Sequence, residues 1–347
     1  MNDISPPRKR RNAGRVTLND VARQVGVSAL TVSRFFNHPE RVSQALRQRI
    51  GEAVSALGYV PNLMAGSLAS ARSRIVGMVI PNISGPIFAD TIQAFSDTLA
   101  RHGHQLLLAS SYFSLEQEEN AVRTFLGWSP AALVVTSHFH SESTEKILAE
   151  AEIPVVETWD YQPGRAPIQV GFLHYDVGVM AARHLLDKGY RRIAFVLNSA
   201  VGDFSALERR AGYGDTLQAA GLESWSFAPS AECVPFEAGK QAMESLMKEA
   251  RPPDAIIFAN DNLAAGGLLT ARRMGLRVPD DCAVMGFGDY AFSGMLLPAL
   301  STIRPPARLI GEIAALRVLE SLSVIPSTTP LQRLNRLECE LVEREST

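Results

Sequence analysis

From Ile75 onward, short apolar runs alternate with amphipathic segments, and this alternation restricts the possible folds more than any other feature of the sequence. The run IVGMVIP precedes the helical pattern PIFADTIQAFSDTLARHG, and a second apolar run, HQLLLAS, follows it. The same order continues with the runs LVVTS, IPVVE, RIAFVLN, AIIFAN and CAVMGFG. Strands that alternate with helices predict parallel sheets covered by helices on both faces.

This alternating region contains two segments with similar patterns, and this internal similarity predicts two lobes. The segments SRIVGMVIP...FADTIQAFSDTLARHG and RRIAFVLN...SALERRAGYGDTLQAAG share a strand, a loop, a helix and a closing glycine. Each lobe is therefore expected to be a doubly wound parallel sheet. Because such sheets bind ligands outside the carboxyl ends of their strands, we expect a ligand cleft between the lobes.

The N-terminal part of the chain has the spacing of three short helices. Thr17 precedes apolar residues at helical spacing, Gly26 ends this first helix, and Ser28 and Ser43 are placed to cap a second and a third. The residues expected to face inward are Leu18, Val21, Ala22, Val25, Val32, Phe35, Phe36, Leu46, Ile50, Val54 and Leu57. A turn of about three residues makes the first two helices cross steeply, as in a helix-turn-helix that enters the major groove. On spacing alone, a plain packed bundle fits equally well.

Charge is distributed unevenly along the chain. Residues 1–73 hold 11 Lys and Arg against 4 Asp and Glu, whereas the other residues hold 23 against 32, within a net charge of −2. A basic tail alone would account for the cluster at residues 8–11 but not for the arginines in the predicted helices. We therefore expect only the N-terminal part to bind a polyanion such as DNA.

The stretch from Val16 to Ser70 resembles the DNA-binding head of the lactose-repressor and galactose-repressor (LacI/GalR) family of bacterial transcription regulators. It carries V-T-x-x-D-V-A-x-x-x-G-V-S-x-x-T-V-S-R, then V-S, L-G-Y-x-P-N and A-x-x-L. The resemblance continues to the C-terminus and implies the fold class. This is an N-terminal three-helix helix-turn-helix DNA-binding domain plus an α/β, periplasmic-binding-protein-like body of two doubly wound parallel-sheet lobes. The implied function is a ligand-controlled transcription regulator, with a repressor favoured.

The resemblance also implies the domain organisation. A basic disordered tail (1–15) precedes the helix-turn-helix domain (16–60), and a hinge helix (61–73) leads to the effector-binding and dimerisation domain (74–347). Lobe one is expected at about 74–172 and 305–330, and lobe two at about 173–304 and 331–347.

One set of residues is expected at the operator by family position. Ala29, Leu30 and Arg34 would face base edges, where an apolar side chain fits a thymine methyl group and arginine pairs with guanine. In the hinge, a leucine would act as the wedge that opens a base step in the minor groove. The residues expected near phosphates are Thr17, Ser28, Thr31, Ser33 and Asn37, and those of the hinge are Asn62, Ala65 and the wedge Leu68.

A second set is expected at the effector, also by family position, at the strand ends of the body. Arg209 is the strongest candidate, because an arginine that opens a helix toward a cleft can donate two hydrogen bonds to a carboxylate, a phosphate or a pair of hydroxyls. Asn260 and Asp261 have the alternative role of fixing a turn. The full set is Phe88, Ser110, Tyr112, Glu157, Asp160, Phe172, Arg209, Asn260, Asp261, Asp289 and Arg304.

The sequence departs from the family pattern at positions that bear on the charge of the expected ligand. Leu173 and Gly288 stand where acidic residues are frequent, and the acid in IPVVETWD is shifted by one place. Together with the early PERVS, these features resemble the gluconate-operon repressor branch of the family. Fewer carboxylates near the cleft reduce the repulsion of an anion, which favours a sugar acid. Hexoses, pentoses and phosphosugars remain alternatives.

The sequence lacks the features that characterise several other classes of protein. Cys233, Cys282 and Cys339 are far apart, which predicts neither a disulfide framework nor a zinc site. No run approaches roughly 18 apolar residues, no export signal is recognisable, and P-loop, GxSxG and HExxH motifs are absent. We therefore expect a cytoplasmic regulator without enzymatic activity, cofactor, metal or membrane, rather than an enzyme or an exported sugar-binding transport protein.

The expected assembly is a homodimer on double-stranded operator DNA, with a small-molecule effector in the cleft. Leu334, Leu337 and Leu341 have the spacing of a tetramerisation repeat. The same segment, however, matches the last core strand of the family. The dimer is therefore favoured.

Overall fold

The computed structural model describes residues 16–61, 73–83, 85–165, 168–200, 202–230, 233–327 and 335–347, apart from the side chain of Asn37. By internal contacts the chain divides into two compact units, Met1–Ser73 and Arg74–Thr347. The predicted tail, most of the predicted hinge helix, and Leu334 lie outside the described residues. The hinge residues that fall there are Asn62, Ala65 and Leu68. The predicted domain and lobe boundaries stay predictions.

The N-terminal unit is built from three α-helices and one 3-10 turn among its described residues. They are α1 (Leu18–Val25), α2 (Ala29–Asn37), η1 (Pro39–Arg41) and α3 (Gln44–Leu57). Thr17 begins α1 through a capping box, in which its backbone N–H and its hydroxyl both donate to the Asp20 carboxylate, at 2.9 and 2.6 Å. The Ser28 hydroxyl accepts from the Thr31 N–H at 3.2 Å and so caps α2. Ser43 occupies the N-cap position of α3, but its side chain makes no capping hydrogen bond, contrary to our expectation.

A small apolar core holds the three helices together. Its buried residues are Val21, Ala22, Val25, Val32, Val42, Ile50, Ala53 and Tyr59, with Phe35, Phe36, Leu46, Val54 and Leu57 packed against them. Arg49 adds a polar link, because its guanidinium donates to the Val25 carbonyl at the end of α1, at 2.7 Å. These contacts fix α2 on a rigid support.

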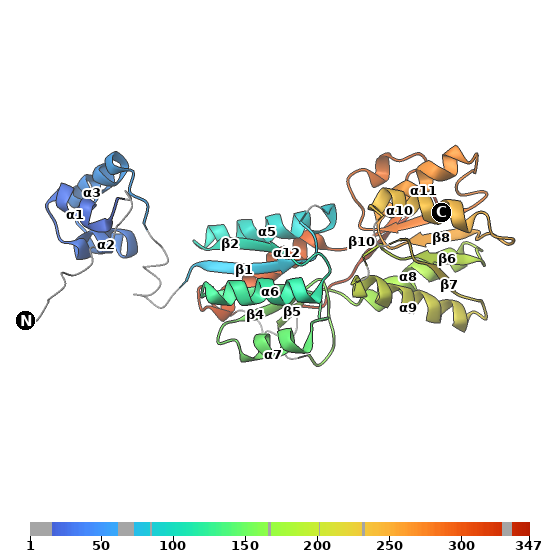
Figure 1. Ribbon diagram of the computed structural model, residues 1–347, viewed down its shortest axis with the longest axis horizontal. Helices are drawn as coiled ribbons and strands as arrows, with labels where there is room; N and C mark the ends of the chain where they lie inside the picture. Colours follow the sequence, from blue (N-terminus) through green and yellow to red (C-terminus); the bar gives the residue numbers. More distant parts are fainter. Residues whose placement is uncertain are drawn as a thin grey trace, which may run out of the picture. The chain divides into compact units, whose positions relative to one another are not determined.

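The first sheet of the second unit is parallel throughout and has the order β2-β1-β3-β4-β5. Its strands are β1 (Ile75–Ile80), β2 (Gln105–Ser110), β3 (Ala132–Thr136), β4 (Val155–Thr158) and β5 (Ile168–Val170). The helices that belong to it are α5 (Ala89–Arg101), α6 (Leu115–Gly127), α7 (Glu142–Glu150) and α12 (Ala307–Ser321), preceded by the turn η2 (Pro86–Phe88). We call this sheet with its helices lobe one (Figure 1).

The second sheet has the order β11-β10-β9-β8-β6-β7 and is parallel except for β11. Its strands are β6 (Ile193–Val196), β7 (Trp225–Phe227), β8 (Ala255–Phe258), β9 (Ala283–Phe287), β10 (Ser301–Arg304) and β11 (Glu340–Val342). Its helical elements are α8 (His174–Asp187), α9 (Phe204–Ala219), α10 (Pro235–Leu246), α11 (Asp261–Arg273) and the turn η3 (Ser293–Met295). We call this part lobe two (Figure 1).

Each sheet is covered on both faces, as the fold class requires. In β1, Met78 joins an apolar cluster with residues of α5 and α12, whereas the next residue, Val79, joins a second cluster with residues of α6 and α7. In β6, Phe195 faces residues of α8 and α9, and Val196 faces residues of α10 and α11. Successive side chains of a strand point to opposite faces, so both sheets are doubly wound. The predicted fold class is confirmed.

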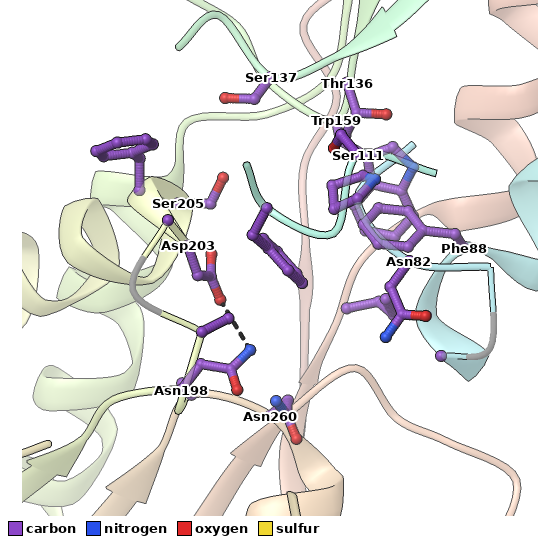
Figure 2. Close-up of a pocket in the computed structure, with 18 of the residues that line it drawn as sticks. Asn82, Phe88, Ser111, Thr136, Ser137, Trp159, Asn198, Asp203, Ser205 and Asn260 are labelled. Carbon is purple, nitrogen blue, oxygen red and sulfur yellow. Dashed lines mark hydrogen bonds between the residues drawn. The ribbon is translucent and has the colours of Figure 1, made fainter. Parts of the chain in front are cut away.

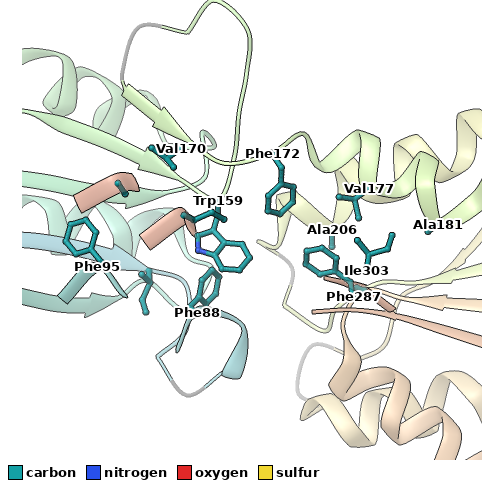
Figure 3. Packing of buried hydrophobic residues seen from close by; sticks show 14 of the residues in the cluster. Phe88, Phe95, Trp159, Val170, Phe172, Val177, Ala181, Ala206, Phe287 and Ile303 are labelled. Atoms are coloured by element: carbon teal, nitrogen blue, oxygen red, sulfur yellow. The ribbon is translucent and has the colours of Figure 1, made fainter. Parts of the chain in front are cut away.

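Aromatic side chains connect the cores of the two lobes. The ring centroids of Phe88 and Trp159 in lobe one are 4.9 Å apart, and those of Trp159 and Phe172 are 6.1 Å apart. Phe172 in turn lies 6.2 Å from Phe287 at the end of β9. These four rings follow one another from one sheet to the other (Figure 3), within a single buried cluster.

Glycines allow neighbouring helices to touch. A Cβ atom at Gly178 of α8 would overlap the backbone carbonyl of Arg209 in α9, and one at Gly212 would overlap that of Tyr175. The backbones of α8 and α9 therefore meet where neither helix has a side chain. This contact sets the position of Arg209 relative to the lobe-two sheet.

We expect Gly178→Ala to lower the free energy of unfolding by about 1–3 kcal/mol, because the added methyl group must push two helix backbones apart. Gly127→Ala is the matched control, since among the described residues no atom beyond its own stretch of helix lies within 4 Å of its added Cβ. It is expected to stabilise α6 slightly, as alanine has the higher helix propensity. Urea unfolding of both variants measures the difference. Equal effects would contradict the proposed close packing.

Candidate functional site

Helix α2 presents both apolar and polar side chains on the surface at its start. Leu30 is 61% exposed, whereas Ala29 is half-buried and packs against the core of the N-terminal unit. Arg34, one turn further along, is exposed. Hydroxyl groups near this surface take part in local contacts, since Thr17 belongs to a capping box and the Ser28 and Thr31 hydroxyls lie 2.9 Å apart. Leu30 and Arg34 are therefore exposed side chains of α2 that remain available for contacts outside this unit.

The second unit contains a cavity of about 300 Å³. Its walls are the loops that follow the strands of both sheets. Lobe one contributes Asn82 after β1, Ser111 after β2, Ser137 after β3 and Trp159 after β4. Lobe two contributes Asn198 after β6 and Asn260 after β8, and Figure 2 shows these side chains around the cavity. The cavity thus lies at the carboxyl ends of both sheets, where open α/β sheets bind their ligands.

The lining combines aromatic faces with neutral polar groups. The aromatic residues are Phe88, Tyr112, Phe113, Phe139, Trp159, Phe204, Phe287 and Tyr290, and the amides are Asn82, Asn198, Asn260 and Asn262. Hydroxyl groups include those of Ser111, Ser114, Thr136, Ser137, Ser199 and Ser205. Two carboxylates, Glu118 and Asp203, and one guanidinium, Arg209, complete the set of ionisable side chains apart from His174 and the tyrosines.

Several lining residues of lobe one have unusual backbone conformations. The φ angles of Tyr112, Phe113, Ser137 and Trp159 are 51°, 60°, 72° and 69°. Bulky residues rarely adopt this left-handed region, and they do so mainly at sites where the surrounding structure enforces it. The loops that line the cavity from lobe one therefore have backbone conformations that the surrounding structure enforces.

Arg209 is 5% exposed and lies at the bottom of the lobe-two wall. Its Nη1 is 3.0 Å from His174 Nδ1, its Nη2 donates to the Ala259 carbonyl at 3.3 Å, and its Cζ lies 4.4 Å from the Phe287 ring centroid. Among the described residues, the nearest carboxylate is that of Asp203, 4.0 Å away. Burial lowers the pKa of Arg209, although no shift that a protein imposes makes an arginine neutral near pH 7. The Arg209 guanidinium is thus buried at the cavity with its positive charge intact and only weakly compensated by the protein.

His174 is the neutral partner of this arginine. Burial, and next the charge of Arg209, lower the pKa of His174 to about 3. Because a guanidinium can only donate, Nδ1 of His174 must accept, which leaves the ring proton on Nε2. His174 therefore orients Arg209 without neutralising it.

Two buried N–H groups at the cavity have no hydrogen-bond partner among the described residues. They are Nε of Arg209 and Nε1 of Trp159, and they come from opposite lobes. Buried donors normally have partners, so such groups call for an explanation. Both nitrogens are also shielded from solvent, so the fold buries them without a partner.

A buried ionic network in lobe one reaches the cavity through Glu118. His140 Nδ1 is 2.7 Å from Glu118 Oε1, and His140 Nε2 is 3.6 Å from Glu157. Burial works to lower the pKa of His140, but the hydrogen bond to Glu118 and the charges of both carboxylates outweigh it and raise the pKa to about 9. Arg165 donates to both oxygens of Glu157 at 2.9 and 2.8 Å, so the network alternates in charge.

Four of the eleven residues expected at the effector line the cavity: Phe88, Tyr112, Arg209 and Asn260. Asn260 also caps α11, since its side chain accepts from the Leu263 N–H at 3.1 Å. Both roles that the sequence left open for Asn260 are therefore compatible.

The other seven do not line the cavity. Ser110 donates to the Pro81 carbonyl, Glu157 binds Arg165, and Phe172 packs between aromatic rings. Asp160 accepts from Ser137, and the Asp289 carboxylate binds Arg304 and Arg344. Asp261 accepts from the Tyr290 N–H, the Ser293 hydroxyl and the Thr302 hydroxyl, at 3.0, 2.6 and 2.7 Å. The seven are Ser110, Glu157, Asp160, Phe172, Asp261, Asp289 and Arg304.

Sequence reasoning missed several lining residues that follow the same strands. Ser111 and Trp159 each come directly after a strand, and Asn82 and Asn198 come one residue later. A strict count from each strand end would have found them. His174 and Asp203 carried no such signal, because they begin α8 and cap α9.

A helix-turn-helix unit combined with a two-lobed, cavity-bearing α/β body defines a ligand-controlled, DNA-binding transcription regulator. Residues 17–62 match the bacterial regulatory proteins of the lacI family, and residues 182–347 match the periplasmic binding protein-like domain. The chain belongs to the LacI family of bacterial regulatory proteins. Like its relatives, it is a regulator of transcription and not an enzyme.

Similarity to individual relatives extends over most of the chain. The HTH-type transcriptional regulator GntR of Pseudomonas aeruginosa is 35% identical over 342 residues, which cover 97% of each chain. The regulator of the same name from Escherichia coli is 32% identical over 305 residues, which cover 88% of this chain and 91% of the relative.

Solved structures agree with this assignment. A LacI family regulator from Silicibacter pomeroyi has a TM-score of 0.88 at 30% identity, covering 95% of this chain and 99% of that one. The lac repressor dimer bound to operator and the anti-inducer ONPF has a TM-score of 0.81 at 25% identity, covering 96% of this chain and 99% of that one.

The His140 network gives stability a specific pH dependence. The folded pKa of about 9 lies above the ordinary value of 6.5, so the stabilisation is fully present below about pH 6.5 and is lost as the pH rises through about 9. We expect the stability advantage of the native chain over His140→Gln to shrink between these two pH values in urea unfolding. His102→Gln, at an exposed histidine of the same lobe, is the control. An advantage that is equal at both pH values would contradict a protonated His140.

Proposed function

We propose that the effector of this regulator is a sugar acid such as gluconate, and that the chain represses an operon for its use. The single observation that carries the effector class is the buried, incompletely neutralised Arg209 at the cavity. The names of the relatives support it, since the GntR regulators of two organisms are similar over most of the chain.

The neutral part of the lining favours a polyhydroxylated molecule. Amide and hydroxyl groups can both donate and accept, so they pair with hydroxyl groups of either orientation. Aromatic faces such as those of Trp159 and Phe88 cover the C–H surface of such a molecule. A cavity of about 300 Å³ lies at the lower end of the range for small-molecule sites.

The charged part favours a carboxylate on that molecule. Of the two carboxylates in the lining, Glu118 is already bound to His140. Asp203 accepts from the Asn198 side chain at 3.3 Å and from the Ala206 N–H at 3.0 Å, so its negative charge is partly used in capping α9. Arg209 lines the cavity, and among the described residues its nearest carboxylate is 4.0 Å away, so its charge remains for an anionic ligand. A carboxylate is the acceptor that arginine binds best in this geometry.

At the operator we propose that Leu30 and Arg34 read base edges. We propose that Ala29 lies close to the DNA but is half-buried against the core of the N-terminal unit. An exposed leucine can contact only one apolar group in the major groove, the thymine methyl, and arginine can donate twice to guanine. We propose that the chain acts as a cytoplasmic homodimer. Separately, none of the helices in the described part of the chain combines the length and the hydrophobicity of a membrane span.

The effector proposal predicts a preference for the acid over the neutral sugar. In calorimetric titrations, gluconate is expected to bind the native chain more tightly than glucose, because only the acid compensates the charge of Arg209. Arg209→Ala should abolish gluconate binding, whereas Arg210→Ala, at the exposed neighbouring arginine, should leave it unchanged. Tighter binding of glucose would refute the ligand class, and full gluconate affinity in Arg209→Ala would refute the residue.

The operator proposal predicts two different kinds of loss. Leu30→Ala should weaken binding by about 1 kcal/mol through a lost methyl contact, and Arg34→Ala by about 1–3 kcal/mol with relaxed preference at one base pair. A binding-site selection assay on both variants measures the preference. Losses of equal size that are independent of sequence would contradict base reading by these residues.

A further inference from the structure

We propose that Glu208 is a clasp between the two lobes and that it sets how readily the cleft opens when no ligand is bound. Glu208 lies on α9, directly before Arg209, but it does not line the cavity. Its carboxylate instead meets two side chains of lobe one. This role concerns the balance between open and closed lobes and does not depend on which effector the cavity binds.

The contacts of the clasp are made by one oxygen of Glu208. Oε1 accepts from the Gln162 side-chain amide at 3.2 Å and lies 3.9 Å from His138 Nε2. The other nitrogen of the same imidazole, Nδ1, lies 2.5 Å from Asp160 Oδ2. His138 follows β3, and Asp160 and Gln162 follow β4, so all three lobe-one groups belong to the loops at the cleft.

These groups are largely removed from solvent. The side chains of His138, Asp160 and Glu208 are 16%, 0% and 23% exposed. The imidazole of His138 therefore lies between two carboxylates, one from each lobe, at a depth where little solvent reaches it. Burial, and next the charge of Asp160, raise the pKa of Glu208, and its lobe-one partner His138 works against this shift. Separation of the lobes would remove that partner.

The clasp is incomplete, which suits a part that must open. Glu208 Oε2 is buried and has no hydrogen-bond partner among the described residues. The closed arrangement therefore gains the contacts of Oε1 but loses the hydration of Oε2. The two effects oppose each other, so the clasp biases the lobes toward closure without locking them.

The position on α9 connects the clasp with the cavity. Phe139, next to His138, stacks on Phe204 at the start of α9 with ring centroids 5.0 Å apart, and both rings line the cavity. Glu208 and Arg209 are consecutive residues, one engaged with lobe one and the other at the cavity. A movement of α9 would therefore change both sets of contacts together.

A bound divalent cation is the alternative occupant of this cluster, since ligand atoms of His138, Asp160 and Glu208 lie within 4.8 Å of one another. The hydrogen bonds favour the direct clasp. Asp160 Oδ2 already accepts from the Ser137 hydroxyl at 3.3 Å in addition to its contact with His138, and Oδ1 accepts from the Tyr161 N–H at 2.8 Å. The carboxylate is thus satisfied without a metal.

Hydrogen exchange of the full chain without ligand tests the clasp. Glu208→Gln removes the charge, and Glu208→Ala removes every contact. We expect backbone amides of lobe one at residues 137–140 and 159–162 to exchange about threefold to tenfold faster in these variants, because the cleft opens more often. A purely local role of Glu208 in lobe two would leave these lobe-one segments unaffected.

Asp215→Asn is the matched control, because Asp215 is another acid of α9 whose partner, the Tyr175 hydroxyl at 2.8 Å, belongs to the same lobe. It should leave lobe-one exchange unchanged. Adding His138→Gln to Glu208→Gln should produce little further acceleration if the two side chains act as one unit. Native exchange rates in both Glu208 variants would overturn the proposal, as would protection of the native chain that requires an added divalent metal such as Zn²⁺.

Discussion

A buried guanidinium whose charge the protein does not fully neutralise is the interaction on which the ligand site depends. Arg209 is surrounded by a neutral imidazole, a carbonyl and an aromatic face, and its nearest carboxylate is 4.0 Å away. Burying a charge without a close partner is costly. Because this charge lies at a cavity, a bound anion would offset the cost. The free energy of that compensation would then contribute to ligand binding.

The rest of the structure serves to hold this group in place. The glycine contact between α8 and α9 sets the position of Arg209 over the sheet, and His174 begins α8 at the point where its Nδ1 meets the guanidinium. Trp159 lines the same cavity from the other lobe. A ligand in the cavity would therefore contact both lobes at once, and closure of the lobes would strengthen its binding. Glu208 supplies a ligand-independent part of the same closure.

The fold could be read from the sequence because it depends on periodic features. Alternating apolar runs specified two parallel sheets, and the glycine at position 26 and the serine at position 28 specified the turn of the head. The site could be predicted only in part. Side chains of a strand alternate between faces, so at a strand end a shift of one residue moves a side chain away from the cavity: Ser111 lines the cavity, whereas Ser110 donates to the Pro81 carbonyl. Asp261 has the sequence position of a ligand residue, yet its carboxylate accepts hydrogen bonds from Tyr290, Ser293 and Thr302. Such partners come from distant segments and leave no local signal.

Thermodynamic linkage between the cleft and the operator tests the central claim most directly. The affinity of the full-length chain for its operator should be measured by fluorescence anisotropy with and without saturating gluconate, and gluconate affinity with and without operator, at one salt concentration. The account predicts that gluconate changes operator affinity by roughly 5- to 150-fold and that operator changes gluconate affinity by the same factor. An operator affinity that gluconate leaves unchanged, although gluconate binds the cleft, would contradict it.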